Sequence, residues 1–145
     1  MQFRTFNKPA RALGFTLIEL LVVLVILGLL AGLVGPKVLG QLGGAKSKTA
    51  RVQIQDFEQA AELFKLDVGR FPTAEEGLAS LITKPASATG WNGPYLKKSE
   101  LPKDPWGRDY VFAAPGKHGE IDIYTLGADG SPGGDGENAD VGNWE

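Results

Sequence analysis

Oxygen-bearing side chains gather near the C-terminus, where they could together bind a hard metal ion. Six of them lie within twelve residues, namely Asp129, Ser131, Asp135, Glu137, Asn138 and Asp140. The intervening glycines let the backbone turn around an ion, and Ca²⁺ takes about six to eight oxygen ligands from side chains and main-chain carbonyls. The pattern therefore predicts a calcium loop. The competing interpretation is a disordered acidic tail, because the segment has few apolar residues.

Two common calcium motifs match this loop only in part. Counted as an EF-hand from Asp129, the loop has Gly134 at position six and Asp140 at position twelve, but Gly133 replaces a side-chain ligand and a strand, not a helix, is expected before it. The repeat Gly133–Asn138 resembles a β-helix calcium turn, but it occurs once and that motif works in tandem. The ligand chemistry fits calcium and neither architecture does.

Glu19 is the second candidate functional residue, because it is an ionisable side chain inside an apolar run from Phe15 to Gly35. A charge in the bilayer costs about 2.5–3.5 kcal/mol on insertion scales, less near the interface. Either Glu19 reaches the cytoplasmic headgroups, or it neutralises a cation of another chain. The nearest candidate cation is a new N-terminus at Phe15, formed by a cut after Gly14.

The apolar run is long enough to cross a membrane, since about 20 residues span the hydrocarbon core. The basic residues Arg4, Lys8 and Arg11 precede it without an acid, which places the N-terminus in the cytoplasm and the rest outside. A cleaved secretory signal is the alternative, but the run is too long for one and no small-residue cleavage site follows.

A single kinked helix is expected from Phe15 to about Asp67. Pro36 interrupts its hydrogen bonding, yet an apolar stripe continues beyond it at helical spacing, formed by Ala50, Ile54, Phe57, Ala61, Phe64 and Val68. The second half of this helix should cover a globular head.

The head is expected to be a small antiparallel sheet with turn-rich connections, which makes the fold class α+β. Thr73–Glu76 is a capping box that predicts a short helix through about Ile82. Residues 109–113 and 120–126 read as strands around a hairpin loop at 117–119. The aromatic side chains are predicted to anchor core and turns, namely Trp91, Tyr95, Trp106, Tyr110, Phe112 and Trp144.

The N-terminal segment Gly14-Phe15-Thr16-Leu17-Ile18-Glu19 resembles the class III signal of type IV pilins and type II secretion pseudopilins. That resemblance implies that the prepilin peptidase removes residues 1–14 and methylates Phe15. It also implies that Glu19 pairs with the terminal amine of a neighbouring subunit. The mature chain would then comprise a membrane and filament-core helix at 15–36 and a periplasmic head at 37–145. The segment around Pro36 would either unwind on assembly or remain an ordinary kink.

The whole chain is similar to the major pseudopilins of type II secretion systems. The motifs Asp104–Gly107, Leu126–Gly130 and Asp140–Trp144 stand where that family has them. The resemblance implies one Ca²⁺ ion bound by the carbonyls of Leu126 and Ser131 and by the side chains of Asp129, Asn138 and Asp140. It implies no clear role for Asp135 or Glu137.

The resemblance also implies a function as a structural subunit that polymerises through its N-terminal helix to drive protein export across the outer membrane. Its partners would be further copies, minor pseudopilins, an inner-membrane assembly platform and membrane lipid. The alternative is a type IV pilin for adhesion, motility or DNA uptake, but such pilins usually close their C-terminal region with a disulfide and this chain has no cysteine.

Composition argues against two other function classes. The single histidine, the lack of cysteine and the lack of a Ser/His/Asp set leave nothing for nucleophilic catalysis, so no enzyme activity is expected. The net charge of −2, without a basic cluster that includes aromatics, argues against nucleic-acid binding.

Overall fold

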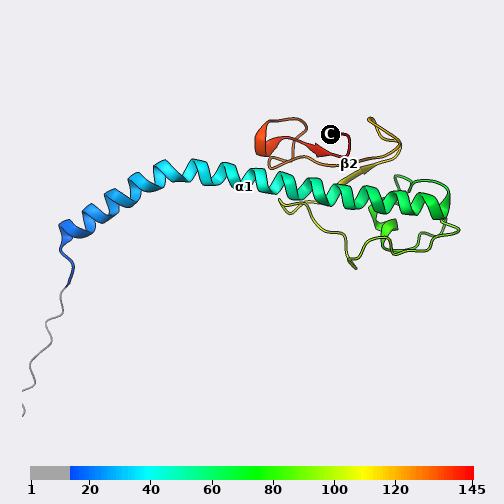
Figure 1. Ribbon diagram of the computed structural model, residues 1–145, viewed down its shortest axis with the longest axis horizontal. Helices are drawn as coiled ribbons and strands as arrows, with labels where there is room; N and C mark the ends of the chain where they lie inside the picture. Colours follow the sequence, from blue (N-terminus) through cyan, green and yellow to red (C-terminus); the bar gives the residue numbers. More distant parts are fainter. Residues whose placement is uncertain (1–13) are drawn as a thin grey trace, which may run out of the picture. The chain divides into compact units, whose positions relative to one another are not determined.

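The computed structural model describes residues 14–145, so all of the predicted leader except Gly14 lies outside the described residues. The described elements are helix α1 (Leu17–Val68), 3₁₀ helix η1 (Leu78–Leu81), strands β1 (Val111–Ala113) and β2 (Asp122–Thr125), 3₁₀ helix η2 (Gly136–Asn138) and strand β3 (Val141–Gly142). Figure 1 follows them along the chain. A long helix packed on a small antiparallel sheet confirms the α+β prediction.

The chain divides into two compact units at Val38–Leu39, and α1 contributes to both. In the first unit α1 is long and apolar enough to cross a membrane, and its most apolar stretch buries none of its residues within the chain. Such a surface is stable in lipid or against other helices, but not in water. Helix α1 begins at Leu17 and ends at Val68, within two residues of the expected limits.

The second unit contains the hydrophobic core, which forms along the predicted stripe of α1. Ile54, Phe57 and Phe64 are almost fully buried. They pack with residues of η1 and of the sheet, and the ring of Tyr110 meets Phe57 edge-on at 5.1 Å between centroids. Residues 50–64 therefore position the head on α1, and the core of the head lies entirely within residues 50–141.

The three strands form one antiparallel sheet in the order β1-β2-β3. Phe112 pairs with Ile123, as the predicted hairpin requires, although both strands are shorter than expected. Strand β3 was not predicted, because only Val141 and Gly142 pair with β2 and two residues carry no periodicity. This strand fixes the C-terminal end of the loop that precedes it.

The capping box at Thr73–Glu76 forms, but it does not open the predicted helix. Its two bonds run from the Glu76 N–H to the Thr73 hydroxyl (3.3 Å) and from the Thr73 N–H to the Glu76 carboxylate (2.8 Å). Gly77 then adopts a φ of 57°, in the left-handed region, so the capped turn stops there and η1 starts separately as a 3₁₀ helix. The prediction of one helix to Ile82 was wrong for that reason.

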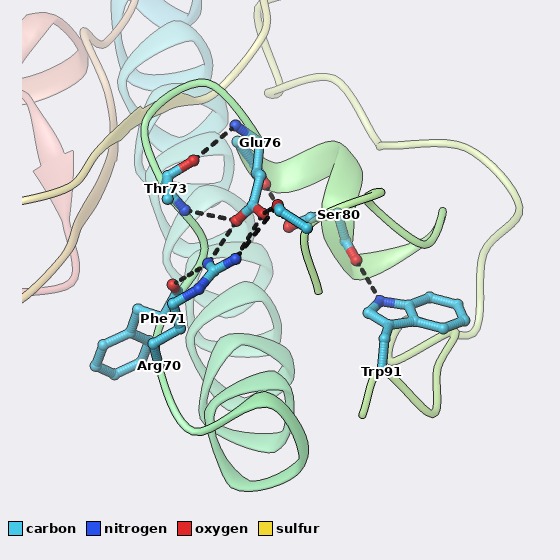
Figure 2. Close-up of polar contacts among 8 residues, drawn as sticks. Arg70, Phe71, Thr73, Glu76, Ser80 and Trp91 are labelled. Carbon is cyan, nitrogen blue, oxygen red and sulfur yellow. Dashed lines mark hydrogen bonds and ion pairs between the residues drawn. The ribbon is translucent and has the colours of Figure 1, made fainter. Parts of the chain in front are cut away.

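Glu76 also joins an ion pair that ties the end of α1 to this turn. Figure 2 shows the Arg70 guanidinium facing the Glu76 carboxylate, with nitrogen–oxygen distances of 2.7 and 2.8 Å. The Arg70 bonds lower the pKa of Glu76 to about 2, assisted by the Ser87 hydroxyl and the Thr73 N–H and opposed by burial. The ionised form of Glu76 therefore stabilises the folded head.

Glu76→Gln should destabilise the head in a pH-dependent way. Because folding lowers this pKa from 4.5, the contribution is complete above pH 4.5 and is lost as the pH falls toward 2. We expect a loss of about 1.5–3 kcal/mol at pH 7, at the lower end because Arg70 is partly exposed, and a smaller loss at pH 3.5. Urea unfolding at both pH values measures this, with exposed Glu75→Gln as control. An equal loss at both pH values would contradict the assignment.

Candidate assembly and calcium sites

The predicted processing site lies in an exposed segment directly before α1. Gly14, Phe15 and Thr16 have no regular secondary structure, and Phe15 is 85% exposed. A protease needs backbone that is free of secondary structure, and this segment offers it. The geometry thus suits a cut between Gly14 and Phe15.

Glu19 forms a capping box with Thr16 at the start of α1. The Glu19 N–H donates to the Thr16 hydroxyl (3.2 Å), and the Thr16 N–H donates to the Glu19 carboxylate at a long 3.4 Å. The sequence analysis missed this role, although the spacing Thr-x-x-Glu was visible. The carboxylate lies at the helix N-terminus, where the helix dipole favours an anion. Within residues 14–145 only one long bond occupies it, so it can accept a bond from another chain.

Pro36 lies inside α1, which is assigned as one helix from Leu17 through Val68. In the single chain the Gly-rich segment around it is therefore helical. Unwinding on assembly stays a prediction about the filament.

A turn outside the C-terminal loop holds the first residues of that loop. The buried Asp104 carboxylate accepts the N–H groups of Trp106 (3.0 Å) and Arg108 (2.7 Å) and the hydroxyl of Thr125 (2.5 Å). The Arg108 guanidinium donates to the carbonyl oxygens of Gly127 and Ala128. Arg108 was missed by the sequence analysis, because its partners lie about twenty residues away.

The loop itself is closed by short-range hydrogen bonds. The Ala128 N–H donates to the Glu137 carbonyl (2.8 Å), and the Ser131 N–H donates to the Asp129 carboxylate (3.0 Å). The Gly133 N–H donates to one carboxylate oxygen of Asp140 (2.9 Å). The loop therefore has a defined fold, which argues against a disordered tail.

Asp140 provides the test of whether this loop suits a cation. Its Oδ1 is buried without a hydrogen-bond partner, a condition shared among the described residues only by the Trp106 indole nitrogen. A buried carboxylate oxygen without a partner is costly, and a bound cation would satisfy it. Within residues 14–145 no three His, Asp or Glu side chains cluster. The predicted ligand set needs only the two carboxylates of Asp129 and Asp140, completed by Asn138 and by the carbonyls of Leu126 and Ser131. These donors are all oxygens, the type of ligand that Ca²⁺ takes.

Two known family models match successive parts of this chain. Residues 37–144 match the family model described as type II secretion system protein G, and residues 9–35 match the prokaryotic N-terminal methylation motif. The chain belongs to the type II secretion protein G family. This confirms the resemblance seen in the sequence, with the processing motif and the head in the expected order.

Individual members of the protein G family align over nearly the whole chain. The type II secretion system core protein G of Vibrio cholerae is 47% identical over 141 residues, covering 95% of both chains. Its counterpart in Pseudomonas aeruginosa is 46% identical over 136 residues, covering 91% of this chain and 94% of the relative. The crystal structure of the major pseudopilin of enterohaemorrhagic Escherichia coli is similar at a TM-score of 0.62 and 33% identity, covering 73% of this chain and 92% of that one.

In this protein G family member the predicted calcium residues share one loop, and Glu137 is directed elsewhere. Its side chain lies against Gly43 of α1, so that a Cβ atom on Gly43 would overlap the Glu137 carboxylate group. Glu137 is exposed, as expected of a residue with no clear counterpart among the family's calcium ligands, and its side chain also contacts α1. Trp144 is stacked on His118 at 4.0 Å between ring centroids and is not part of the core.

Proposed function

We propose that this chain is a structural subunit of the type II secretion pseudopilus, which polymerises through its N-terminal helix and so drives protein export across the outer membrane. The observation that carries this is the order of a methylation motif at residues 9–35 and a protein G head at 37–144. The head match also favours secretion over the alternative, a type IV pilin for adhesion, motility or DNA uptake.

In this proposal α1 spans the inner membrane once, with the N-terminus in the cytoplasm and the head in the periplasm. The apolar surface of α1 in the first unit is not buried within the chain. We therefore expect it to be covered by lipid before assembly and by helices of other copies afterwards. Besides further copies, the partners would be the prepilin peptidase, minor pseudopilins and the inner-membrane assembly platform. No catalytic role is proposed.

Glu19 would fix the register between copies. After a cut behind Gly14, the new amine of Phe15 is a cation at the membrane surface, and the Glu19 carboxylate of a neighbouring copy could neutralise it. Pairing of the two charges lowers the cost of holding either one in an apolar environment. Only one axial offset between helices brings the two groups together, so the pair selects a register.

We further propose that the C-terminal loop binds one Ca²⁺ ion. Asp129, Asn138 and Asp140 would supply side-chain oxygens, and Leu126 and Ser131 would supply carbonyls. The orphaned Asp140 Oδ1 supports this assignment. The ion would offset the repulsion between the acids, while the Arg108 contacts hold the entry of the loop in place.

The processing step can be tested by intact mass spectrometry of protein extracted from membranes. A cut after Gly14 leaves 145 − 14 = 131 residues and removes Arg4, Lys8 and Arg11, which changes the net charge from −2 to −5. We expect that mass with one added methyl group on Phe15. Assembled protein that still carries the full leader would contradict the proposal, and Gly14→Lys provides an uncut control.

A further inference from the structure

Gly43 is buried although its neighbours on α1 are not. Between Leu39 and Thr49 it is the one buried residue, and the hydrophobic core begins only at Ala50. The burial therefore does not come from the core. It comes from the C-terminal loop, because the Cγ, Cδ and Oε1 atoms of Glu137 occupy the space in which a Cβ of Gly43 would stand.

The segment of α1 at this point is intrinsically weak. Gly40, Gly43 and Gly44 lie within one and a half turns, and glycine is the least favourable helix residue after proline. The Ser47 hydroxyl also bonds to the Gly43 carbonyl at 3.2 Å, a pattern that does not strengthen a helix. Helical order here needs support from outside the helix.

Glu137 connects this segment to the interior of the loop. Its carbonyl accepts the Ala128 N–H at 2.8 Å, next to Asp129, and η2 continues from it into Asn138. The Asn138 carbonyl is enclosed by Gly127 and Gly134, where added Cβ atoms would stand 2.6 Å from its oxygen. The position of the Glu137 side chain is thus set by how the loop closes.

We propose that Gly43 is the seat of the C-terminal loop on α1, and that the Glu137 side chain docked there couples the order of residues 126–140 to the helical state of residues 40–47. A larger residue at this position would displace the exposed Glu137 side chain from α1. Through this coupling the packed loop stabilises the weakest turns of the head's helix. Bound calcium would increase that stabilisation, which rests on the calcium site proposed above.

Amide hydrogen exchange on the full chain in detergent micelles tests this with a matched pair of variants. Gly43→Ala and Gly44→Ala make the same gain in helix propensity, but a Cβ at Gly44 has no atom within 4 Å. Gly44→Ala should slow exchange at residues 40–47. Gly43→Ala should instead speed exchange there and at 128–140 by about twofold or more, because its Cβ pushes the Glu137 side chain off the helix and removes this contact between loop and helix.

A second substitution at Glu137 tests whether Glu137 is the residue that a side chain at position 43 displaces. Glu137→Ala removes all three overlapping atoms, so Gly43→Ala/Glu137→Ala should exchange more slowly at 128–140 than Gly43→Ala alone. Equal behaviour of the two glycine variants, or no rescue, would overturn the seat. The exchange of all variants is measured both in chelator and with Ca²⁺. The data in chelator test the contact between Gly43 and Glu137 by themselves. If added Ca²⁺ changes nothing, only the proposed calcium site is contradicted. If Ca²⁺ protects 128–140 without protecting 40–47, the coupling is overturned.

Discussion

Glu19→Ala should insert into the membrane and be processed normally, yet lose nearly all filament formation and secretion. Insertion should improve slightly, because the variant removes a charge from the apolar run. Assembly should fail because the Phe15 amine of each neighbouring copy would enter the filament without a counter-charge, and burying an uncompensated charge costs about 3–5 kcal/mol per contact. Such a cost repeats at every subunit. Secretion of a reporter enzyme from cells whose only major pseudopilin is the variant measures the effect.

The capping box supplies the control for this experiment. Thr16→Ala removes the hydroxyl that accepts the Glu19 N–H, and so weakens the start of α1 by about 1 kcal/mol, but it keeps the carboxylate. We expect Thr16→Ala to retain most secretion. If it fails as completely as Glu19→Ala, assembly depends on the capped start of α1 and not on a charge pair between copies. If Glu19→Ala secretes normally, the carboxylate only reaches the headgroups.

Removal of calcium should destabilise the soluble head, residues 37–145, by a large and reversible step. A ligand that binds only the folded state stabilises it by about 2.7 kcal/mol at a hundredfold excess over Kd. For a domain of this size that is a shift in Tm of roughly 10 °C or more. Asp129→Ala and Asp140→Ala should each abolish the shift between Ca²⁺ and chelator. In cells these variants should be degraded before they assemble.

Glu137→Ala is the matched control among the acids of the loop. Its side chain lies on Gly43, not among the proposed ligands, so the calcium-dependent shift should largely remain. The Tm in chelator is expected to fall slightly. Thermal unfolding of the wild type and each variant, followed by circular dichroism with and without chelator, measures these shifts. If chelator leaves the wild-type Tm unchanged, the loop does not bind calcium at a useful affinity.

Local patterns predicted the helix and its buried face well. The stripe through Ile54, Phe57 and Phe64 identified the face of α1 that carries the core, because helical periodicity is a property of neighbouring residues. The capping box at Thr73 formed as predicted, but one left-handed glycine at Gly77 ended it. The equivalent box formed by Thr16 and Glu19 was not predicted, although the two residues have the same spacing as Thr73 and Glu76.

Contacts between distant segments could not be predicted in the same way. Asp122 is an acidic residue with no sequence signal for burial, yet it is buried. Burial opposes its ionisation, but bonds from the Lys117 and His118 N–H groups and the His118 ring outweigh burial and lower its pKa. The Gly43–Glu137 contact likewise joins two ends of the head, and no local pattern marks either residue. The calcium ligands were predicted from family resemblance and oxygen content, and they remain a prediction.

The most direct test of the filament assignment is electron microscopy of the sheared surface fraction from cells that overproduce this chain together with the other secretion components. We expect thin filaments that are labelled by antibodies against the head and that contain only the form beginning at methylated Phe15. Filaments should be absent when Glu19→Ala replaces the wild type. Processed wild-type protein that stays in the membrane fraction without forming filaments, while secretion proceeds, would contradict the account.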